Sequence, residues 1–236
     1  MQEIQANSPG ERILYDADAA ERVDRSWFNP AARGWLTGNA QGRGQALFFR
    51  HRETEYVLRH YRRGGAVAAV LGDRYFYTGL HRTRAWREWG LLARVTALGL
   101  PAPRPLAARV VIAGLFYRAD LITYRLMDTR PLSEILKHAP LPQAAWREVG
   151  RVIARFHDAH VCHADLNAHN VMLDARGEVA LIDFDRARFR RSAARWRRAN
   201  LVRLHRSLRK LKRLNPALNF SASDFEALRA GYGSLD

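Results

Sequence analysis

Hydrophobic and polar residues alternate along parts of the first half of the chain, and this period of two predicts β-strands. The alternation is clear over residues 55–61, and two apolar segments over 107–112 and 116–126 are typical of a strand pair. Another strand is expected over 45–49, directly after a cluster of glycines. These segments predict a sheet in the N-terminal half, to which residues 1–37 would add a strand and a helix.

Elsewhere the apolar residues recur at a spacing near 3.6, which predicts amphipathic helices. One helix is expected over 83–98, where Gly99 ends it just before three prolines. A second and stronger helix is expected over 143–160. After it come a polar loop, two short strands over 171–173 and 179–182, and a basic helix.

The change of period divides the chain into two lobes. We expect an α+β, bilobal fold with a strand-rich N-lobe over 1–126 and a helical C-lobe over 127–236. The length of 236 residues and the hydrophobic fraction of 47% suit such a pair and exclude disorder over most of the chain. The longest uncharged apolar segment, 110–117, is far shorter than the roughly 20 residues that span a bilayer. The start of the chain lacks a signal-peptide pattern, so we expect a cytoplasmic protein.

The charge of the chain is strongly basic and unevenly distributed. There are 39 basic and 23 acidic residues, a formal net charge of +16, and residues 186–214 contain 13 basic residues and no acidic one. Such a segment attracts phosphates, and its charge alone does not distinguish nucleic acid from anionic lipid. The only cysteine, Cys162, excludes an intramolecular disulfide and a cysteine-cluster metal site, and we expect it to be buried.

The loop after the second helix has the strongest chemical signal. His163, Asp165 and Asn170 match the kinase catalytic-loop pattern HxDxxxxN, and Asp183 follows at the end of an apolar strand, where kinases carry a metal-binding aspartate. Phosphoryl transfer needs a carboxylate that orients the acceptor hydroxyl and accepts its proton, and oxygen ligands for magnesium on the phosphates of ATP. We therefore predict three catalytic residues: Asp165 acts on the acceptor, and Asn170 and Asp183 bind Mg²⁺.

Two further parts of a nucleotide site can be placed on the N-lobe and its boundary. Gly42 and Gly44 lie in the glycine cluster between two expected strands, where backbone N–H groups can cover phosphates. Met127 would be the hinge residue that contacts adenine.

Arg59 stands in the strand position where kinases have a lysine, because no lysine occurs before Lys137. An arginine is always charged and can bind a phosphate or a carboxylate through two N–H groups, so the exchange is chemically reasonable. Arg62 is the alternative. Glu88, the only acidic residue in the expected helix over 83–98, would be the partner of Arg59.

Four segments resemble the Kdo kinase family of lipopolysaccharide biosynthesis. They are GRG at 42–44, LRHYRRGG at 58–65, HADLNAHN at 163–170 and LIDFD at 181–185, within a similarity over about residues 38–214. The resemblance implies a protein-kinase-like fold and ATP-dependent phosphorylation of the 4-hydroxyl of 3-deoxy-D-manno-octulosonic acid (Kdo) on Kdo-lipid A. It also implies a peripheral location on the cytoplasmic face of the inner membrane.

The chain differs from protein kinases in ways that bear on the acceptor. It has no APE segment, Asn167 replaces the catalytic-loop lysine, and Asp185 replaces the glycine of DFG. Only about 50 residues follow Asp183, too few for a large substrate-docking region. A peptide acceptor is therefore not expected.

The basic helix gains a candidate partner from this resemblance. Over 196–211, apolar residues at 201, 204, 208 and 211 form one face and arginines another. The apolar face would pack on the C-lobe, and the arginines would meet an anionic glycolipid or the membrane surface rather than nucleic acid. We predict that five arginines orient the acceptor: Arg62, Arg63, Arg197, Arg198 and Arg203.

Three classes of function remain open. The favoured class is a sugar kinase that acts on a lipopolysaccharide precursor. A small-molecule phosphotransferase of the aminoglycoside-kinase type shares the loop motif, but its cationic substrates call for an acidic acceptor pocket. A degenerate kinase that only binds nucleic acid or membrane is disfavoured because Asp165, Asn170 and Asp183 are all present.

Overall fold

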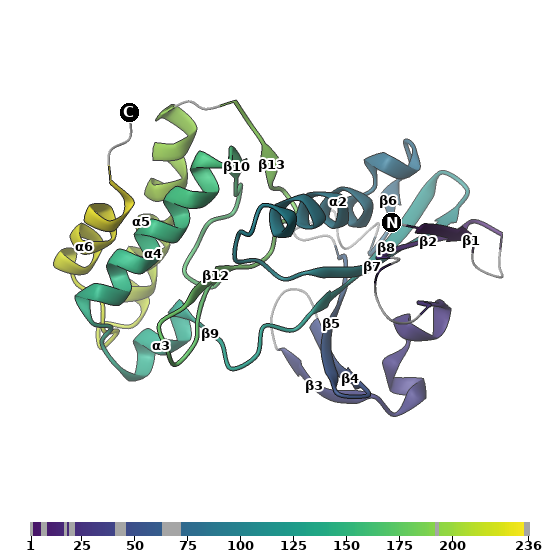
Figure 1. Cartoon of the computed structure of the whole chain (residues 1–236), viewed down its shortest axis with the longest axis horizontal. Helices are drawn as coiled ribbons and strands as arrows, with labels where there is room; N and C mark the ends of the chain where they lie inside the picture. Colours follow the sequence, from purple (N-terminus) through teal and green to yellow (C-terminus); the bar gives the residue numbers. More distant parts are fainter. Residues whose placement is uncertain are drawn as a thin grey trace. The chain divides into compact units, whose positions relative to one another are not determined.

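The computed structural model describes residues 2–5, 9–16, 18, 22–40, 46–62, 72–191 and 194–233. Contacts divide the chain into two compact units. Unit 1 comprises Met1–Ala93 and Pro103–Arg125, and unit 2 comprises Arg94–Ala102 and Leu126–Asp236. Most strands lie in unit 1 and most α-helices in unit 2 (Figure 1), which confirms the expected α+β fold class.

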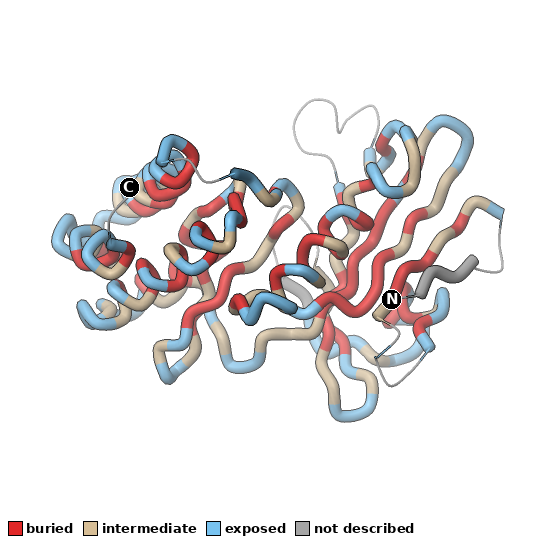
Figure 2. The backbone as a smooth tube through the Cα atoms, turned by 45° about the horizontal axis from the view of Figure 1, so that its top comes forward, coloured by how far each residue is buried: buried red, intermediate tan, exposed pale blue. Residues whose placement is uncertain are grey.

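Unit 1 is built on one antiparallel sheet with the strand order β1-β2-β7-β8-β5-β4-β3, in which β6 also pairs with β8. The strands are β1 (Gln2–Gln5), β2 (Glu11–Tyr15), β3 (Leu36–Ala40), β4 (Ala46–His51), β5 (Thr54–His60), β6 (Tyr75–Phe76), β7 (Pro105–Ala113) and β8 (Phe116–Tyr124). The four strands expected from apolar patterning correspond to β4, β5, β7 and β8. Burial is greatest along the central strands (Figure 2).

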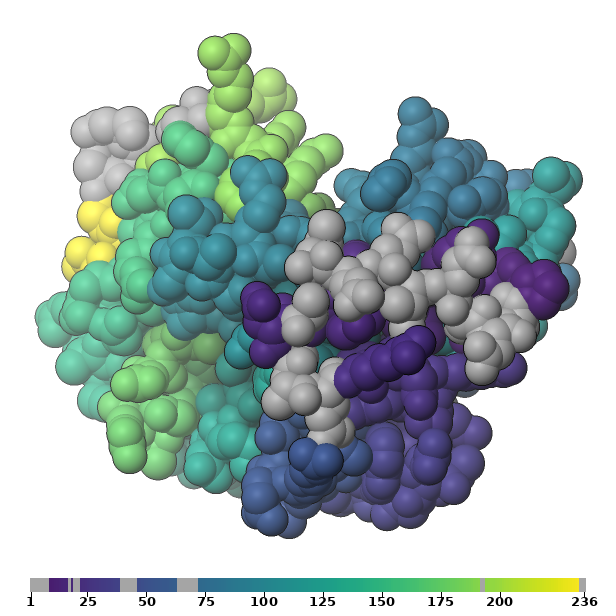
Figure 3. Space-filling view, turned by 45° about the vertical axis from the view of Figure 1, so that its right-hand side comes forward, coloured from purple at the N-terminus to yellow at the C-terminus, as the bar shows by residue number. Residues whose placement is uncertain are grey.

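One face of this sheet is covered by an aromatic cluster. Two short 3-10 helices, η1 (Arg25–Phe28) and η2 (Pro30–Arg33), place Trp27 edge-on to Tyr56 of β5, with 5.4 Å between ring centroids. The space-filling view shows η1, η2, β3 and β4 together on the surface, in purple to blue (Figure 3). The strand and the helix expected within residues 1–37 correspond to β2 and to these two 3-10 turns, which serve as an apolar cover.

The opposite face carries α2 (Arg84–Ala97), the helix expected over 83–98. It buries Trp86, Trp89 and Leu92. Arg59 of β5 contacts this helix, whereas its neighbour Leu58 belongs to the aromatic cluster. Because successive side chains of a strand point to opposite faces, α2 and the aromatic cluster lie on opposite sides of the sheet.

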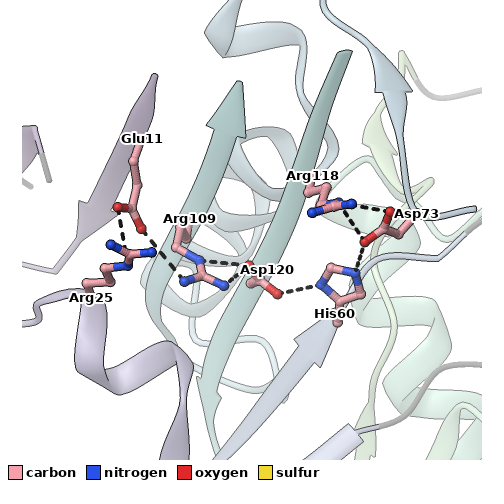
Figure 4. Close-up of polar contacts among 7 residues, drawn as sticks. All are labelled: Glu11, Arg25, His60, Asp73, Arg109, Arg118 and Asp120. Atoms are coloured by element: carbon pink, nitrogen blue, oxygen red, sulfur yellow. Dashed lines mark hydrogen bonds and ion pairs between the residues drawn. The ribbon is translucent and has the colours of Figure 1, made fainter. Parts of the chain in front are cut away.

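A chain of charged contacts runs across neighbouring strands of the sheet (Figure 4). Asp120 of β8 is buried and accepts from Arg109 of β7 at 2.8 Å, and it lies 2.7 Å from Nδ1 of His60. The other ring nitrogen of His60 lies 3.0 Å from Asp73. Since a histidine can donate from both nitrogens only when it is protonated, these two carboxylates raise the pKa of His60, chiefly through the hydrogen bond to Asp120.

Unit 2 contains four helices and two small sheets among its described residues. The helices are α3 (Leu132–His138), α4 (Gln143–Asp158), α5 (Ala194–Leu214) and α6 (Ala222–Tyr232). The strand pairs are β10 (Val161–Cys162) with β13 (Arg188–Phe189), and β12 (Val179–Leu181) with β11 (Val171–Leu173), which also pairs with β9 (Arg130–Pro131). As expected, α4 is amphipathic, α5 is basic and Cys162 is buried.

Helix α6 was not expected from the sequence, and it packs against α4 at very short range. A Cβ atom at Gly150 would lie 2.0 Å from the carbonyl oxygen of Leu228, and one at Gly231 would lie 2.0 Å from that of Arg147. Glycine is therefore required on both helices. No helix among the described residues is long and apolar enough to cross a membrane.

Candidate active site

The loop between β10 and β11 is held by its own asparagines. The side-chain nitrogens of Asn167 and Asn170 both donate to the carbonyl oxygen of Asp165, each at 2.9 Å. The side-chain oxygen of Asn167 accepts from the backbone N–H of His169 at 2.8 Å. Asn170 is buried, whereas the side chain of Asp165 is exposed. The loop thus fixes the backbone of Asp165 and leaves its carboxylate accessible to a substrate.

Two strand pairs bring the second acidic segment to this loop. In the β11–β12 pair Val171 lies opposite Leu181, and in the β10–β13 pair Cys162 lies opposite Arg188. The backbone N–H of Ile182 then donates to the carbonyl oxygen of Asn170 at 3.0 Å. Asp183 is the next residue, so Asn170 and Asp183 are neighbours in space although 13 positions separate them in the sequence.

His163 holds the segment that carries Asp183. Its Nε2 atom lies 2.9 Å from the carbonyl oxygen of Ile182, and its ring meets Phe184 edge-on with 4.9 Å between centroids. His163 and Phe184 are buried, and Phe184 also stacks on Phe156 of α4. His163 therefore fixes the backbone that carries Asp183 and does not itself face a substrate.

Asp183 adopts a left-handed backbone conformation, with φ at +66°. This region is unfavourable for residues with a Cβ atom, although aspartate tolerates it better than most. The hydrogen bonds that flank Asp183 hold it there. Backbone strain of this kind is enriched at functional sites, so it agrees with the catalytic role predicted for this carboxylate.

The donor set suits magnesium bound together with a nucleotide. Among the described residues, no group of three or more His, Cys, Asp or Glu side chains forms a ready-made metal site. The predicted ligands are one carboxylate, Asp183, and one amide, Asn170. Magnesium is usually held by one or two protein oxygens plus phosphates and water, so this pair fits it. The amide nitrogen of Asn170 donates to the carbonyl oxygen of Asp165, which fixes the direction of its Oδ1 atom.

In unit 1, the predicted partners Arg59 and Glu88 form an ion pair. A guanidinium nitrogen of Arg59 lies 2.8 Å from Oε1 of Glu88, whose side chain is fully buried. The Arg59 side chain is 28% exposed, so part of it is accessible to a ligand. The exchange of lysine for arginine at this position is thus compatible with the strand-to-helix pair that kinases use.

Sequence reasoning did not identify Tyr61 as part of this pair. Its hydroxyl donates to Oε2 of Glu88 at 2.5 Å. Burial and the nearby Glu88 carboxylate raise the pKa of Tyr61, so it stays protonated and keeps donating. The alternation of the strand could have identified Tyr61, because Arg59 and Tyr61 are two residues apart and therefore share a face of the sheet.

The structure corrects the expectation for Arg197. Its side chain is buried in unit 2, 3.0 Å from Oδ1 of Asp158, and it donates to the carbonyl oxygen of His157 at 3.1 Å. Arg197 therefore joins α5 to the end of α4 and cannot orient an acceptor. It occupies the face defined by Leu201 and Leu204, because a long arginine can line an apolar face when a carboxylate meets its charge.

The remaining predicted residues have the following places. Arg62, Arg198 and Arg203 are exposed, and Met127 is 53% exposed in the turn after β8. Three predicted residues, Gly42, Gly44 and Arg63, lie outside the described residues.

Comparison with known proteins gives matches along almost the whole chain. The family model described as Lipopolysaccharide kinase (Kdo/WaaP) family matches residues 30–232. The 3-deoxy-D-manno-octulosonic acid kinase of Photobacterium profundum is 38% identical over 225 residues, which is 94% of either chain. The proteins of the same name from Xylella fastidiosa and Xanthomonas campestris are 42% and 44% identical, over 93% of this chain and 88% of theirs.

Proposed function

Because the chain belongs to the lipopolysaccharide kinase (Kdo/WaaP) family, we propose that it is an ATP-dependent kinase that phosphorylates the 4-hydroxyl of Kdo on Kdo-lipid A in lipopolysaccharide core biosynthesis. The observation that carries the proposal is the similarity, over more than nine tenths of this chain, to proteins named 3-deoxy-D-manno-octulosonic acid kinase. The arrangement of Asp165, Asn170 and Asp183 supports the kinase chemistry.

Asp165 has the properties of the group that receives the acceptor proton. Its carboxylate is exposed, and two side-chain amides fix its backbone. In the proposed reaction the acceptor hydroxyl gives its proton to Asp165 while its oxygen bonds to the γ-phosphorus of ATP. The bond from that phosphorus to the bridging oxygen breaks, and ADP leaves.

Asn170 and Asp183 would hold Mg²⁺, which neutralises negative charge on the phosphates when it is bound. The role of Asn170 and Asp183 is to hold two oxygen atoms in fixed positions. The Ile182–Asn170 backbone hydrogen bond keeps the two side chains together, and His163 fixes the turn that carries Asp183. Loss of either oxygen ligand should weaken binding of magnesium nucleotide more than binding of the acceptor.

The nucleotide phosphates are assigned to Arg59. Glu88 of α2 holds the arginine, as a kinase glutamate holds its lysine, and the hydroxyl of Tyr61 donates to the other oxygen of Glu88. Gly42 and Gly44 would add backbone N–H groups, and Met127 would contact adenine. These three assignments rest on the sequence.

The acceptor is assigned to Arg198 and Arg203 of α5 together with Arg62 and Arg63. Ser207 of α5 accepts from the backbone N–H of Ala168 at 3.2 Å, and Arg203 stands one helical turn before Ser207. Arg198 lies on the same helix, and the assignment of Arg62 and Arg63 rests on the sequence. Cations at these positions suit the carboxylate and phosphates of an anionic glycolipid at the cytoplasmic face of the inner membrane.

The test is phosphate transfer from γ-labelled ATP, with magnesium, to Kdo-lipid A. Lipid A without Kdo and kanamycin serve as parallel acceptors, and the Asp165→Ala protein serves as the blank. We expect label only on the Kdo-bearing lipid, with none in the blank. Label on kanamycin, or on lipid A that lacks Kdo, would contradict the proposed acceptor.

A further inference from the structure

A basic groove lies on unit 2 between α5 and the segment that leads into α6. Its volume is about 1210 Å³, and none of its lining residues is acidic. Five cationic side chains line it: Arg206, Arg209, Lys210, Lys212 and Arg213. None of them has been assigned a role in catalysis or in orienting the acceptor.

Four of these five cations have no ion-pair partner among the described residues. Lys212 donates to the carbonyl oxygen of Leu218 at 2.6 Å and so closes the turn between the helices. The other four are exposed, and none forms an ion pair with any residue in the described part of the chain. Like charges brought together repel each other unless an anion lies between them, so the groove favours an anionic ligand.

Aromatic and aliphatic groups lie among these cations. The ring of His205 stacks on Phe225 with 4.0 Å between centroids, and Phe220 lies beside it. Burial and the charge of Arg209 lower the pKa of His205, which keeps its ring uncharged at neutral pH. Val202, which lines the groove, is 49% exposed, and Leu214, the last residue of α5, is 69% exposed. A helix that exposes both cations and apolar side chains is typical of a protein surface at a bilayer interface.

Much of the groove lies on a different side of α5 from the catalytic loop. Ser207, which contacts that loop through Ala168, is two residues from both His205 and Arg209. Residues two apart on an α-helix point in nearly opposite directions, since each residue turns the helix by about 100°. Arg209 and Arg213 therefore point away from the side of Ser207, whereas Lys210, seven residues after Arg203, borders that side.

We infer that this groove is the membrane-contact site of the protein and that it binds the phosphate headgroups of anionic phospholipids. The inference rests on the proposed function, because a kinase of a lipid-anchored sugar must work at a bilayer surface. Duplex nucleic acid also presents phosphates, but it offers no apolar layer for Val202 and Leu214. A bilayer offers both phosphates and an apolar layer.

The test is sedimentation of the full chain with vesicles of equal parts phosphatidylglycerol and phosphatidylcholine, without ATP. We expect the triple variant Arg206→Gln, Arg209→Gln, Arg213→Gln to lose affinity on the order of 100-fold. A control variant with the same loss of charge, Arg147→Gln, Arg176→Gln, Arg229→Gln, alters exposed arginines of unit 2 outside the groove. It should bind almost as well as the unaltered protein.

Equal losses in both triple variants would overturn the inference, because they would show an effect of net charge alone. Tighter binding of duplex DNA than of the vesicles at the same salt concentration would also overturn it. Transfer to detergent-dispersed Kdo-lipid A should be unchanged in the groove variant. If the unaltered protein transferred no phosphate but still needed the groove for vesicle binding, the proposed function would fail and the membrane site would remain.

Discussion

Arginines on the sheet of unit 1 and arginines along α5 of unit 2 have different surroundings. On the sheet, Arg109 and Arg118 each meet a carboxylate within 3 Å, and the contacts continue through His60 (Figure 4). On α5, the exposed arginines of the groove have no acidic partner among the described residues. Arg197, in contrast, forms an ion pair with Asp158. The basic residues that give the net charge of +16 therefore include two populations. Some hold strands together, and others are available to external anions.

The largest effect should follow removal of the buried carboxylate at the centre of the sheet contacts. Asp120→Ala leaves Arg109 and His60 without their shared partner, and we expect the free energy of unfolding to fall by about 3 kcal/mol. Urea denaturation measures this. Arg206→Gln, which removes an unpaired cation, should change the same quantity by less than about 0.5 kcal/mol. Similar losses in the two variants would remove the distinction between the two populations.

The next effect concerns Arg59, a paired arginine that we also assign to the nucleotide. Glu88→Gln removes the charge that holds it, so kcat/KM for ATP should fall on the order of 100-fold. The KM for Kdo-lipid A should change little. Glu148→Gln breaks an ion pair of similar type on the surface of α4 and is the matched control. An unchanged KM and kcat for ATP in Glu88→Gln would show that the pair is only structural.

A smaller effect is expected from Arg198 and Arg203, the two exposed arginines of α5 that we assign to the acceptor. The double variant Arg198→Gln, Arg203→Gln should raise the KM for Kdo-lipid A by on the order of tenfold. The KM for ATP and the urea midpoint should stay as they are. Steady-state kinetics with each substrate in turn separates these results. A rise in the KM for ATP instead would show that these arginines contact the nucleotide and not the acceptor.

The smallest effect should be a pH dependence of stability from His60. Its folded pKa is raised above the ordinary value of 6.5, so its contribution is complete below pH 6.5 and is lost as pH rises through the folded pKa. Asp120, Asp73, Arg109 and Arg118 are the charged groups around it. Unfolding measured against pH should show the difference between the unaltered protein and His60→Gln shrinking with rising pH. A difference that grows with pH would contradict the assignment.

Local motifs explain what the sequence could predict. The loop with Asp165 and Asn170 and the strand end with Asp183 are short segments whose spacing is set by a single β-hairpin. Helices α2 and α4 follow from periodicity within one element. The ion pair between Arg59 and Glu88 was predicted because kinases use the same strand and helix for it.

Contacts that depend on strand register or on helix crossings could not be predicted in the same way. Asp120 pairs with Arg109 on one side and His60 on the other because these residues lie directly opposite one another in the sheet. The burial of Arg197 depends on where α4 ends. Helix α6 was missed although Ser221 and Asp224 form a capping box, since its small residues give only a weak apolar period.

The most direct test of the central claim locates the phosphate on the product. Kdo-lipid A treated with the protein, ATP and magnesium is analysed by tandem mass spectrometry and by phosphorus–proton correlation NMR. We predict one added phosphate on the 4-oxygen of Kdo, and none with Asp165→Asn protein that still binds ATP. A phosphate on any sugar other than Kdo, or equal product from the Asp165→Asn protein, would contradict the claim.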